Sequence, residues 1–164
     1  MPEAYAAATL TGSFGDARAA AARATEAAGP HGSAVQLVRP EVVAGPRHIA
    51  SAAVHAMRAF AEGRGRTQSL ELELLCYLTG QRQIREALAR GGLPPGATRA
   101  VAVALGGAPR DALEAVAASL AAARSWEIPR AGPEVLAALG APRAVAGDPE
   151  LRALERVALL DTER

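Results

Sequence analysis

Hydrophobic and polar positions along the chain follow two periods, and the changes of period separate helices from strands. In alanine-rich stretches apolar residues recur every third or fourth position, as in amphipathic helices, whereas "RAVAVALG" alternates with the period of a strand. The pattern predicts helices at 15–28, 46–63, 70–79, 81–90, 109–123, 133–139 and 147–161, and strands at 4–10, 34–40, 99–106 and 125–129. Strands scattered among helices predict the α+β class, with helices packed around a short, mostly antiparallel sheet in one domain over residues 1–164.

The stretch "SLELELLCYLTGQRQIREAL", residues 69–88, requires a choice between the two periods. Leucine alternates with glutamate at its start, but a strand would place the apolar residues 74–78 on both sides of a sheet. We interpret 70–79 as a helix, with Ser69 as the N-cap and Gly80 suited to a left-handed cap. Leu72 and Cys76 then fall off the apolar face. The turn that follows is polar and rich in amides.

Composition limits the chemistry that the chain can support. Half of the 164 residues are hydrophobic but only 3% are aromatic, which predicts an aliphatic, alanine-rich core. The net charge is +1, so no global field attracts nucleic acid. All 18 basic residues are arginine, which excludes lysine Schiff-base and P-loop chemistry. Residues 39–90 hold eight arginines against five carboxylates, so a basic surface would be built there.

Targeting signals and cysteine pairs are not visible in the sequence. One cysteine excludes an internal disulfide, and no stretch has the pattern of a signal peptide. No apolar run approaches the roughly 20 residues that cross a bilayer. We therefore expect a cytoplasmic protein that does not interact with membranes.

Candidate chemistry is sparse. The spacing of ligands and nucleophiles fits no metal site, phosphate loop or catalytic pair, so we expect no cofactor, no metal and no catalytic residue. "GSFGDA", residues 12–17, precedes a helix and is a candidate anion site, although an ordinary loop is the simpler interpretation. On the helix at 46–63, Arg47 and Arg58 lie opposite the apolar stripe, with His48 and His55 on its border. That face suits an RNA backbone or an unstacked base, or is an ordinary solvated face.

Two stretches, "VVAGPRHIASAAVHAMRAF" (42–60) and "SLELELLCYLTGQRQIREAL" (69–88), resemble the kinase-binding small subunit of the KEOPS complex. This family includes the PRPK-binding protein TPRKB, and the resemblance is to its archaeal type. The Gly-Gln-Arg-Gln-Ile run at 80–84 is the most specific part. "RAVAVALG" and "LERVALLD" lie where the next strand and the closing helix of the family belong. The absence of lysine is a departure from the family.

The resemblance implies a non-catalytic adaptor or regulatory subunit. Such a subunit binds the atypical kinase/ATPase of KEOPS and, through it, joins the threonylcarbamoyl-transferase subunit. It also helps to recruit the 3′ CCA end of tRNA for N6-threonylcarbamoyladenosine (t6A) modification. Two alternatives stay open: a small enzyme that uses Cys76 or the pair His48 and His55, and a homo-oligomeric scaffold without an RNA role.

Two sets of site residues follow from the resemblance together with the charge and apolar patterns. The basic surplus predicts an RNA-facing surface that joins the outer face of the helix at 46–63 to the turn at 81–83, and apolar groups off the inward stripes predict the kinase contact. The RNA-binding candidates are Arg47, His48, His55, Arg58, Arg82 and Gln83. The kinase-interface candidates are Leu72, Cys76, Leu154, Val157 and Leu160.

Overall fold

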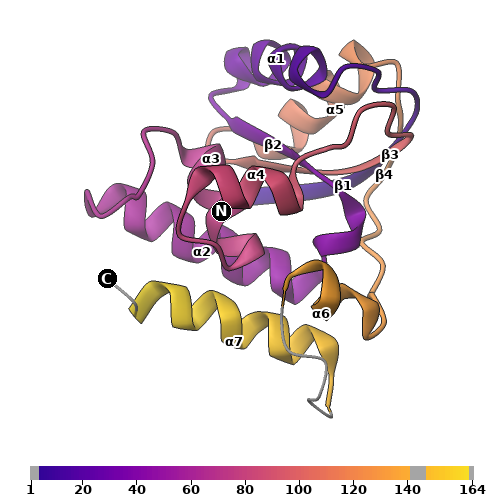
Figure 1. Cartoon of the computed structure of the whole chain (residues 1–164). Coiled ribbons are helices and arrows are strands. Elements are labelled where there is room, and N and C mark those ends of the chain that lie inside the picture. Colours follow the sequence, from indigo (N-terminus) through magenta and orange to yellow (C-terminus); the bar gives the residue numbers. More distant parts are fainter. Residues whose placement is uncertain (1–3, 141–146, 163–164) are drawn as a thin grey trace. The chain divides into compact units, whose positions relative to one another are not determined.

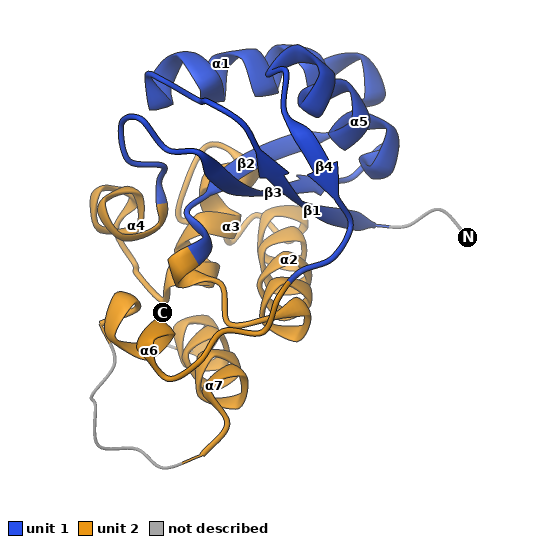
Figure 2. Ribbon diagram, turned by 90° about the vertical axis from the view of Figure 1, so that its right-hand side faces the viewer, with its two compact units in different colours: residues 1–40, 92–128 blue, residues 41–91, 129–164 orange. Residues whose placement is uncertain are grey.

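The computed structural model describes residues 4–140 and 147–162, which fall into two compact units (Figures 1 and 2). Unit 1 comprises residues 1–40 and 92–128, and unit 2 comprises residues 41–91 and 129–164. Each unit therefore combines two segments that are far apart in the sequence. That residues 1–164 form one domain stays a prediction.

The described elements have the following bounds. Unit 1 holds β1 (Tyr5–Thr11), α1 (Ala17–Ala28), the 3-10 helix η1 (Gly29–His31), β2 (Ala34–Val38), β3 (Arg99–Leu105), α5 (Pro109–Ser119) and β4 (Ala123–Ser125). The 3-10 helix η2 (Pro40–Val42) begins at the boundary. Unit 2 holds α2 (Pro46–Ala61), α3 (Leu70–Thr79), α4 (Ile84–Gly91), α6 (Glu134–Ala138) and α7 (Pro149–Thr162).

Unit 1 is built on a four-stranded sheet in the order β2-β3-β1-β4, in which every neighbouring pair is antiparallel. Ala100, Ala102 and Ala104 of β3 share one buried cluster with inward residues of α1 and α5. Because alanine is small, these alanine-rich helices can pack closely on the sheet. The predicted α+β class and the antiparallel sheet are confirmed.

Unit 2 is helical, and its order follows from contacts between helix ends. His48 at the start of α2 lies against Leu78 at the end of α3, so these two helices are antiparallel. Arg47 contacts Asp148 just before α7, and Arg64 just after α2 lies near Asp161 in the last turn of α7. Helices α2 and α7 therefore run side by side in the same direction (Figure 1).

Most elements expected from the sequence are present, and three of them have a boundary that is shifted by three residues or more. Helix α4 begins at Ile84 rather than at 81, α5 ends at Ser119, and the last strand is at 123–125 rather than 125–129. The last two shifts share a cause in the turn after α5, where Ala121 has a φ of 51°. The Ala122 N–H donates to Ala117 O at 2.9 Å, which closes the helix in a left-handed cap.

Replacing Ala121 by glycine should stabilise the protein, because a Cβ is unfavourable in the left-handed conformation and glycine has none. We expect the free energy of unfolding to rise by about 0.5–1 kcal/mol, measured by urea denaturation. The control is Ala22→Gly on the exposed side of α1, which should lower the same free energy by about 1 kcal/mol. Two changes of the same sign would contradict this interpretation of the turn.

Candidate functional site

The start of α2 is capped by a carboxylate from α7. The Arg47 N–H donates to Glu150 Oε2 at 3.2 Å, and the Arg47 side chain donates through Nε to Glu150 Oε1 at 2.7 Å and through Nη2 to Asp148 at 3.2 Å. The Glu150 side chain is 2% exposed. Gly45 is required beside it, because a Cβ at this position would overlap the Glu150 carboxylate. The interaction with Glu150, followed by that with Asp148, raises the pKa of Arg47.

His48 lies inside unit 2 and not on a solvated border. Its Nδ1 accepts from the Ala44 N–H at 3.0 Å, so Nε2 carries the proton and donates to Leu78 O at 2.9 Å. The side chain is fully buried, and burial lowers its pKa to about 4. The prediction that His48 faces RNA is therefore wrong. The residues around His48 do not reveal its burial, because its acceptor, Leu78 O, lies thirty residues away in the sequence.

The other candidates on α2 differ in exposure. Arg47 and Arg58 are exposed, whereas His55 is half-buried. His55 Nδ1 donates to Ser51 O at 2.8 Å, and its ring lies 5.7 Å from the ring of Tyr77. Arg47 is engaged by the carboxylates of α7, so an RNA phosphate would have to compete with them for it.

The turn after α3 is both a helix cap and an exposed segment. Gly80 has a φ of 68° and a ψ of 27°, and the Gln81 N–H donates to Cys76 O at 3.0 Å. This confirms the predicted left-handed cap. Arg82 and Gln83 follow on the surface. Because α2 and α3 are antiparallel, the turn lies beside the start of α2. Arg58 lies eleven residues after Arg47 on α2, which is roughly 16 Å along the helix axis.

The kinase-interface candidates are mostly inside unit 2. Cys76, Val157 and Leu160 are at most 2% exposed, so the prediction that they lie on the surface is wrong. Leu72 and Leu154 are half-buried.

Helix α7 has one buried and one exposed side. Ala153 and Val157 are buried and lie one turn apart, so they define its buried side. The opposite side, which we term the outer α7 face, consists of Leu151, Glu155, Ala158 and Leu159. Leu151 is 50% exposed and Leu159 is 56% exposed.

A cavity of about 170 Å³ opens beside Leu159. Gly80, Arg156 and Leu160 also line it. Arg156 also donates through Nη2 to Leu139 O at 3.2 Å, at the end of α6. The exposed turn after α3 therefore meets the last two turns of α7 at this cavity.

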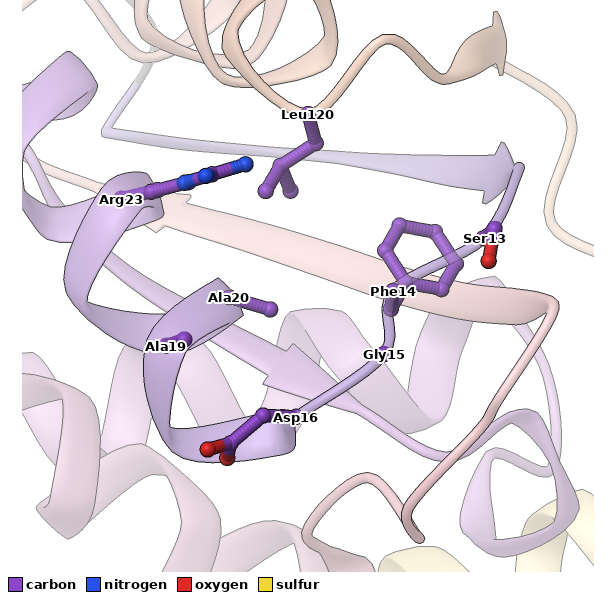
Figure 3. Close-up of a pocket in the computed structure, with 8 residues that line it drawn as sticks. All are labelled: Ser13, Phe14, Gly15, Asp16, Ala19, Ala20, Arg23 and Leu120. Carbon is purple, nitrogen blue, oxygen red and sulfur yellow. The ribbon is translucent and has the colours of Figure 1, made fainter.

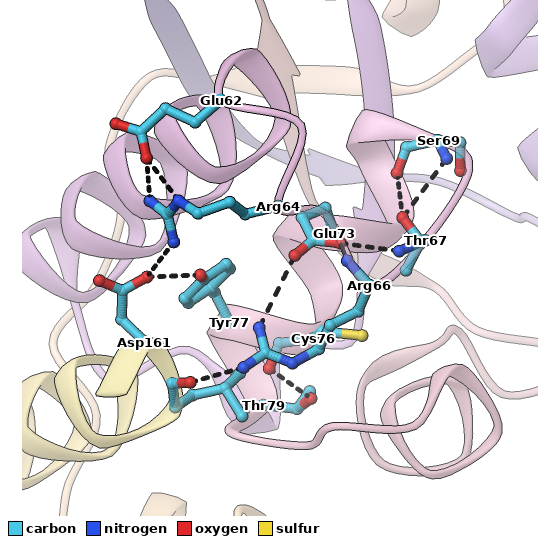
Figure 4. A network of polar contacts seen from close by, with 11 residues as sticks. Glu62, Arg64, Arg66, Thr67, Ser69, Glu73, Cys76, Tyr77, Thr79 and Asp161 are labelled. Atoms are coloured by element: carbon cyan, nitrogen blue, oxygen red, sulfur yellow. Dashed lines mark hydrogen bonds and ion pairs between the residues drawn. The ribbon is translucent and has the colours of Figure 1, made fainter. Parts of the chain in front are cut away.

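A polar network connects the segment after α2 with α3 and the end of α7 (Figure 4). Glu73 is fully buried, and its Oε2 accepts from the N–H groups of Arg66 at 2.8 Å and Thr67 at 3.1 Å. Tyr77 Oη donates to Asp161 Oδ1 at 2.7 Å. Burial and then the hydrogen bond to Asp161 raise the pKa of Tyr77 to about 12, so it stays a donor.

Neither alternative enzyme site gains support from its surroundings. Burial, followed by the nearby charge of Glu73, raises the pKa of the Cys76 thiol to about 11, whereas a nucleophilic cysteine needs a lowered pKa. The buried, hydrogen-bonded His48 is not accessible to a substrate. Within residues 4–140 and 147–162, no three His, Cys, Asp or Glu side chains come together as metal ligands.

Unit 1 has a separate cavity of about 280 Å³ at the loop 12–16 (Figure 3). Phe14 and Leu120 supply its apolar lining, and Asp16 and Arg23 supply charges. Asp16 Oδ1 accepts from the Arg18 N–H at 2.9 Å and so caps α1 with its own carboxylate. An anion at this helix start would meet that charge, so the ordinary-loop interpretation of "GSFGDA" is the better one.

The chain matches the family model described as kinase binding protein CGI-121 over residues 19–128. This range covers more than half of the chain. No curated protein matches the chain. None of the helices in the described ranges combines the length and the apolar composition of a membrane span.

Proposed function

Because the chain belongs to the CGI-121 family of kinase-binding proteins, we propose that it is the non-catalytic adaptor subunit of a KEOPS complex. It binds the atypical kinase/ATPase subunit and, through it, joins the threonylcarbamoyl-transferase subunit. It also helps to recruit the 3′ CCA end of tRNA for N6-threonylcarbamoyladenosine modification. The observation that carries the proposal is the family match over residues 19–128.

The outer α7 face is the surface that we assign to the kinase. Leu151 and Leu159 are the two most exposed large apolar side chains among the described residues. A contiguous apolar patch is typical of a protein interface, and Leu151, Ala158 and Leu159 are exposed on one side of α7. Leu154 lies half-buried at the border of the face and extends the apolar surface.

Gel filtration of the purified chain mixed with a KEOPS atypical kinase tests the adaptor role. We expect one peak that contains both proteins in a 1:1 ratio, with no new catalytic turnover by the adaptor itself. Separate elution of the two proteins at micromolar concentration would contradict the proposal.

The surface that we assign to tRNA combines the turn after α3 with the start of α2. Arg82 and Gln83 are exposed on this turn, and Arg47 is exposed in the first turn of α2. Arginine grips phosphate with two parallel donors, and an amide reads base edges. His55 and Arg58 lie further along α2, where a longer stretch of single-stranded tRNA would reach them.

Replacing Arg82 by alanine should weaken binding of tRNA and reduce its dependence on salt. Each phosphate contact to a single strand contributes about −0.7 to the slope of log affinity against log salt, and the variant should lose about one contact. The measurement is fluorescence anisotropy with labelled tRNA over a salt series. Arg85→Ala, a second exposed arginine, is the matched control and should behave as the wild type.

Removing the CCA nucleotides should weaken binding more than changing the anticodon. Equal binding of trimmed and intact tRNA would contradict the proposal that this protein recruits the CCA end. An Arg82→Ala protein that binds tRNA as the wild type does would show that the turn is only a helix cap.

A further inference from the structure

The last turn of α7 is held by side chains from elsewhere in unit 2 (Figure 4). Tyr77 of α3 donates through Oη to Asp161 Oδ1 at 2.7 Å. Arg66, in the segment between α2 and α3, donates through Nη2 to Leu160 O at 2.6 Å. That carbonyl is one of the last four of the helix, which lack an intrahelical partner. We name Arg66, Tyr77 and Asp161 the α7 clamp.

The donors of the α7 clamp are themselves fixed. Arg66 Nη1 lies 3.8 Å from the buried Glu73 carboxylate, and the Arg66 guanidinium lies 5.6 Å from the centre of the Tyr77 ring. The Arg66 N–H donates to the same Glu73 carboxylate at 2.8 Å. A donor held from both its backbone and its side chain loses little entropy when it binds an acceptor, so α7 meets a preorganised partner.

The polar contacts matter because the end of α7 has little apolar packing of its own. Leu160 is the last buried residue of the helix, and the two positions that follow it, Asp161 and Thr162, are polar. Leu159 in the same turn points outward and is 56% exposed. Helix ends fray unless their terminal groups are bonded. The α7 clamp supplies such bonds to the turn that carries Leu159.

We propose that Tyr77 and Asp161, supported by Arg66, are positioning residues for kinase binding. They keep the last turn of α7 helical and so fix Leu159 in the orientation that the kinase contacts. This inference rests on the proposed function, because it concerns the outer α7 face.

A double-mutant cycle with Tyr77→Phe and Asp161→Ala tests the inference. Amide hydrogen exchange at residues 159–162 measures fraying, and calorimetric titration with a KEOPS atypical kinase measures affinity. Each single variant should speed exchange at these amides about tenfold, as expected for the loss of a hydrogen bond to a charged group. The double variant should add little to Asp161→Ala, because that change already removes the contact with Tyr77, together with the carboxylate that lies 3.8 Å from Arg64. Asp161→Asn keeps an acceptor oxygen, so the amides at 159–162 in this variant should exchange about as slowly as in the wild type.

Kinase affinity should follow the helical fraction of the last turn, since only the helical form presents Leu159. We expect the double variant to bind roughly threefold to tenfold more weakly, with Asp161→Asn close to the wild type. The control is Thr79→Val, which removes a buried hydroxyl of α3 that bonds within its own helix. It should change neither measurement.

Three outcomes separate the possibilities. Unchanged exchange at 159–162 in both single variants overturns the α7 clamp. Faster exchange with unchanged kinase affinity overturns the positioning role. A wild-type chain that does not bind the kinase contradicts the proposed function itself, and the exchange data then still decide whether the α7 clamp exists.

Discussion

A Glu150→Ala protein should unfold at a markedly lower urea concentration than the wild type. The Glu150 side chain is almost fully buried, and its carboxylate bonds the backbone and the side chain of Arg47 at the start of α2. The substitution removes the cap of α2, since Gly45 has no side chain to replace it, and it leaves space where the carboxylate was. We expect the free energy of unfolding to fall by about 2–3 kcal/mol.

The matched control is Glu155→Ala on the same helix. Glu155 is exposed, and its contact is with Arg152 three residues earlier, so the expected loss is within about 0.5 kcal/mol. Glu150→Gln keeps an acceptor but not the charge and should fall between the two variants. Equal stability of the Glu150→Ala and Glu155→Ala proteins would mean that the cap does not hold α2 and α7 together.

Lowering the pH from 7 towards 4 should remove a stabilising contribution that comes from His48. Burial lowers the pKa of this imidazole from 6.5 to about 4. Between these values the unfolded chain binds a proton at His48 that the folded chain does not bind. The free energy of unfolding therefore falls as the pH falls through this window, and the full contribution is present above pH 6.5. The pKa difference corresponds to about 3 kcal/mol.

Comparison with His48→Gln isolates this effect from the titration of the carboxylates. The variant should be less stable at pH 7, because it disturbs the contacts to Ala44 and Leu78. It has no imidazole to titrate, so its disadvantage should shrink by about 2–3 kcal/mol between pH 7 and pH 4.5. The measurement is urea denaturation of both proteins at several pH values. Parallel stability curves would show that His48 is not held neutral in the folded protein.

Local signals in the sequence predicted much of the secondary structure. The helix at 70–79 was predicted correctly from its length and from Gly80, because a left-handed cap is a property of one residue and its neighbours. The strand at β3 was predicted from alternation that its buried alanines confirm. The end of α5 was predicted too late, because no glycine marks the left-handed turn at Ala121.

The site was predicted less well because it depends on contacts between distant segments. His48 was assigned to a helix border, but its position on the helix does not reveal the acceptor at Leu78. Likewise, the sequence near Arg47 does not reveal the carboxylate of Glu150. On α7 the candidates Leu154, Val157 and Leu160 are spaced three residues apart, which is less than a helical turn of about 3.6 residues, so each points to a different side of the helix. Val157 and Leu160 face inward, whereas Leu151 and Leu159 lie on the outer α7 face.

Calorimetric titration of the chain with a KEOPS atypical kinase tests whether this protein binds a kinase through the outer α7 face. We expect 1:1 binding by the wild type and, for Leu159→Glu, binding weakened about a hundredfold, the scale of an interface hot spot. Phe60→Glu places the same charge on another exposed apolar residue, which is 40% exposed on α2, and should bind within about threefold of the wild type. No binding by the wild type, or equal binding by Leu159→Glu, would contradict the claim.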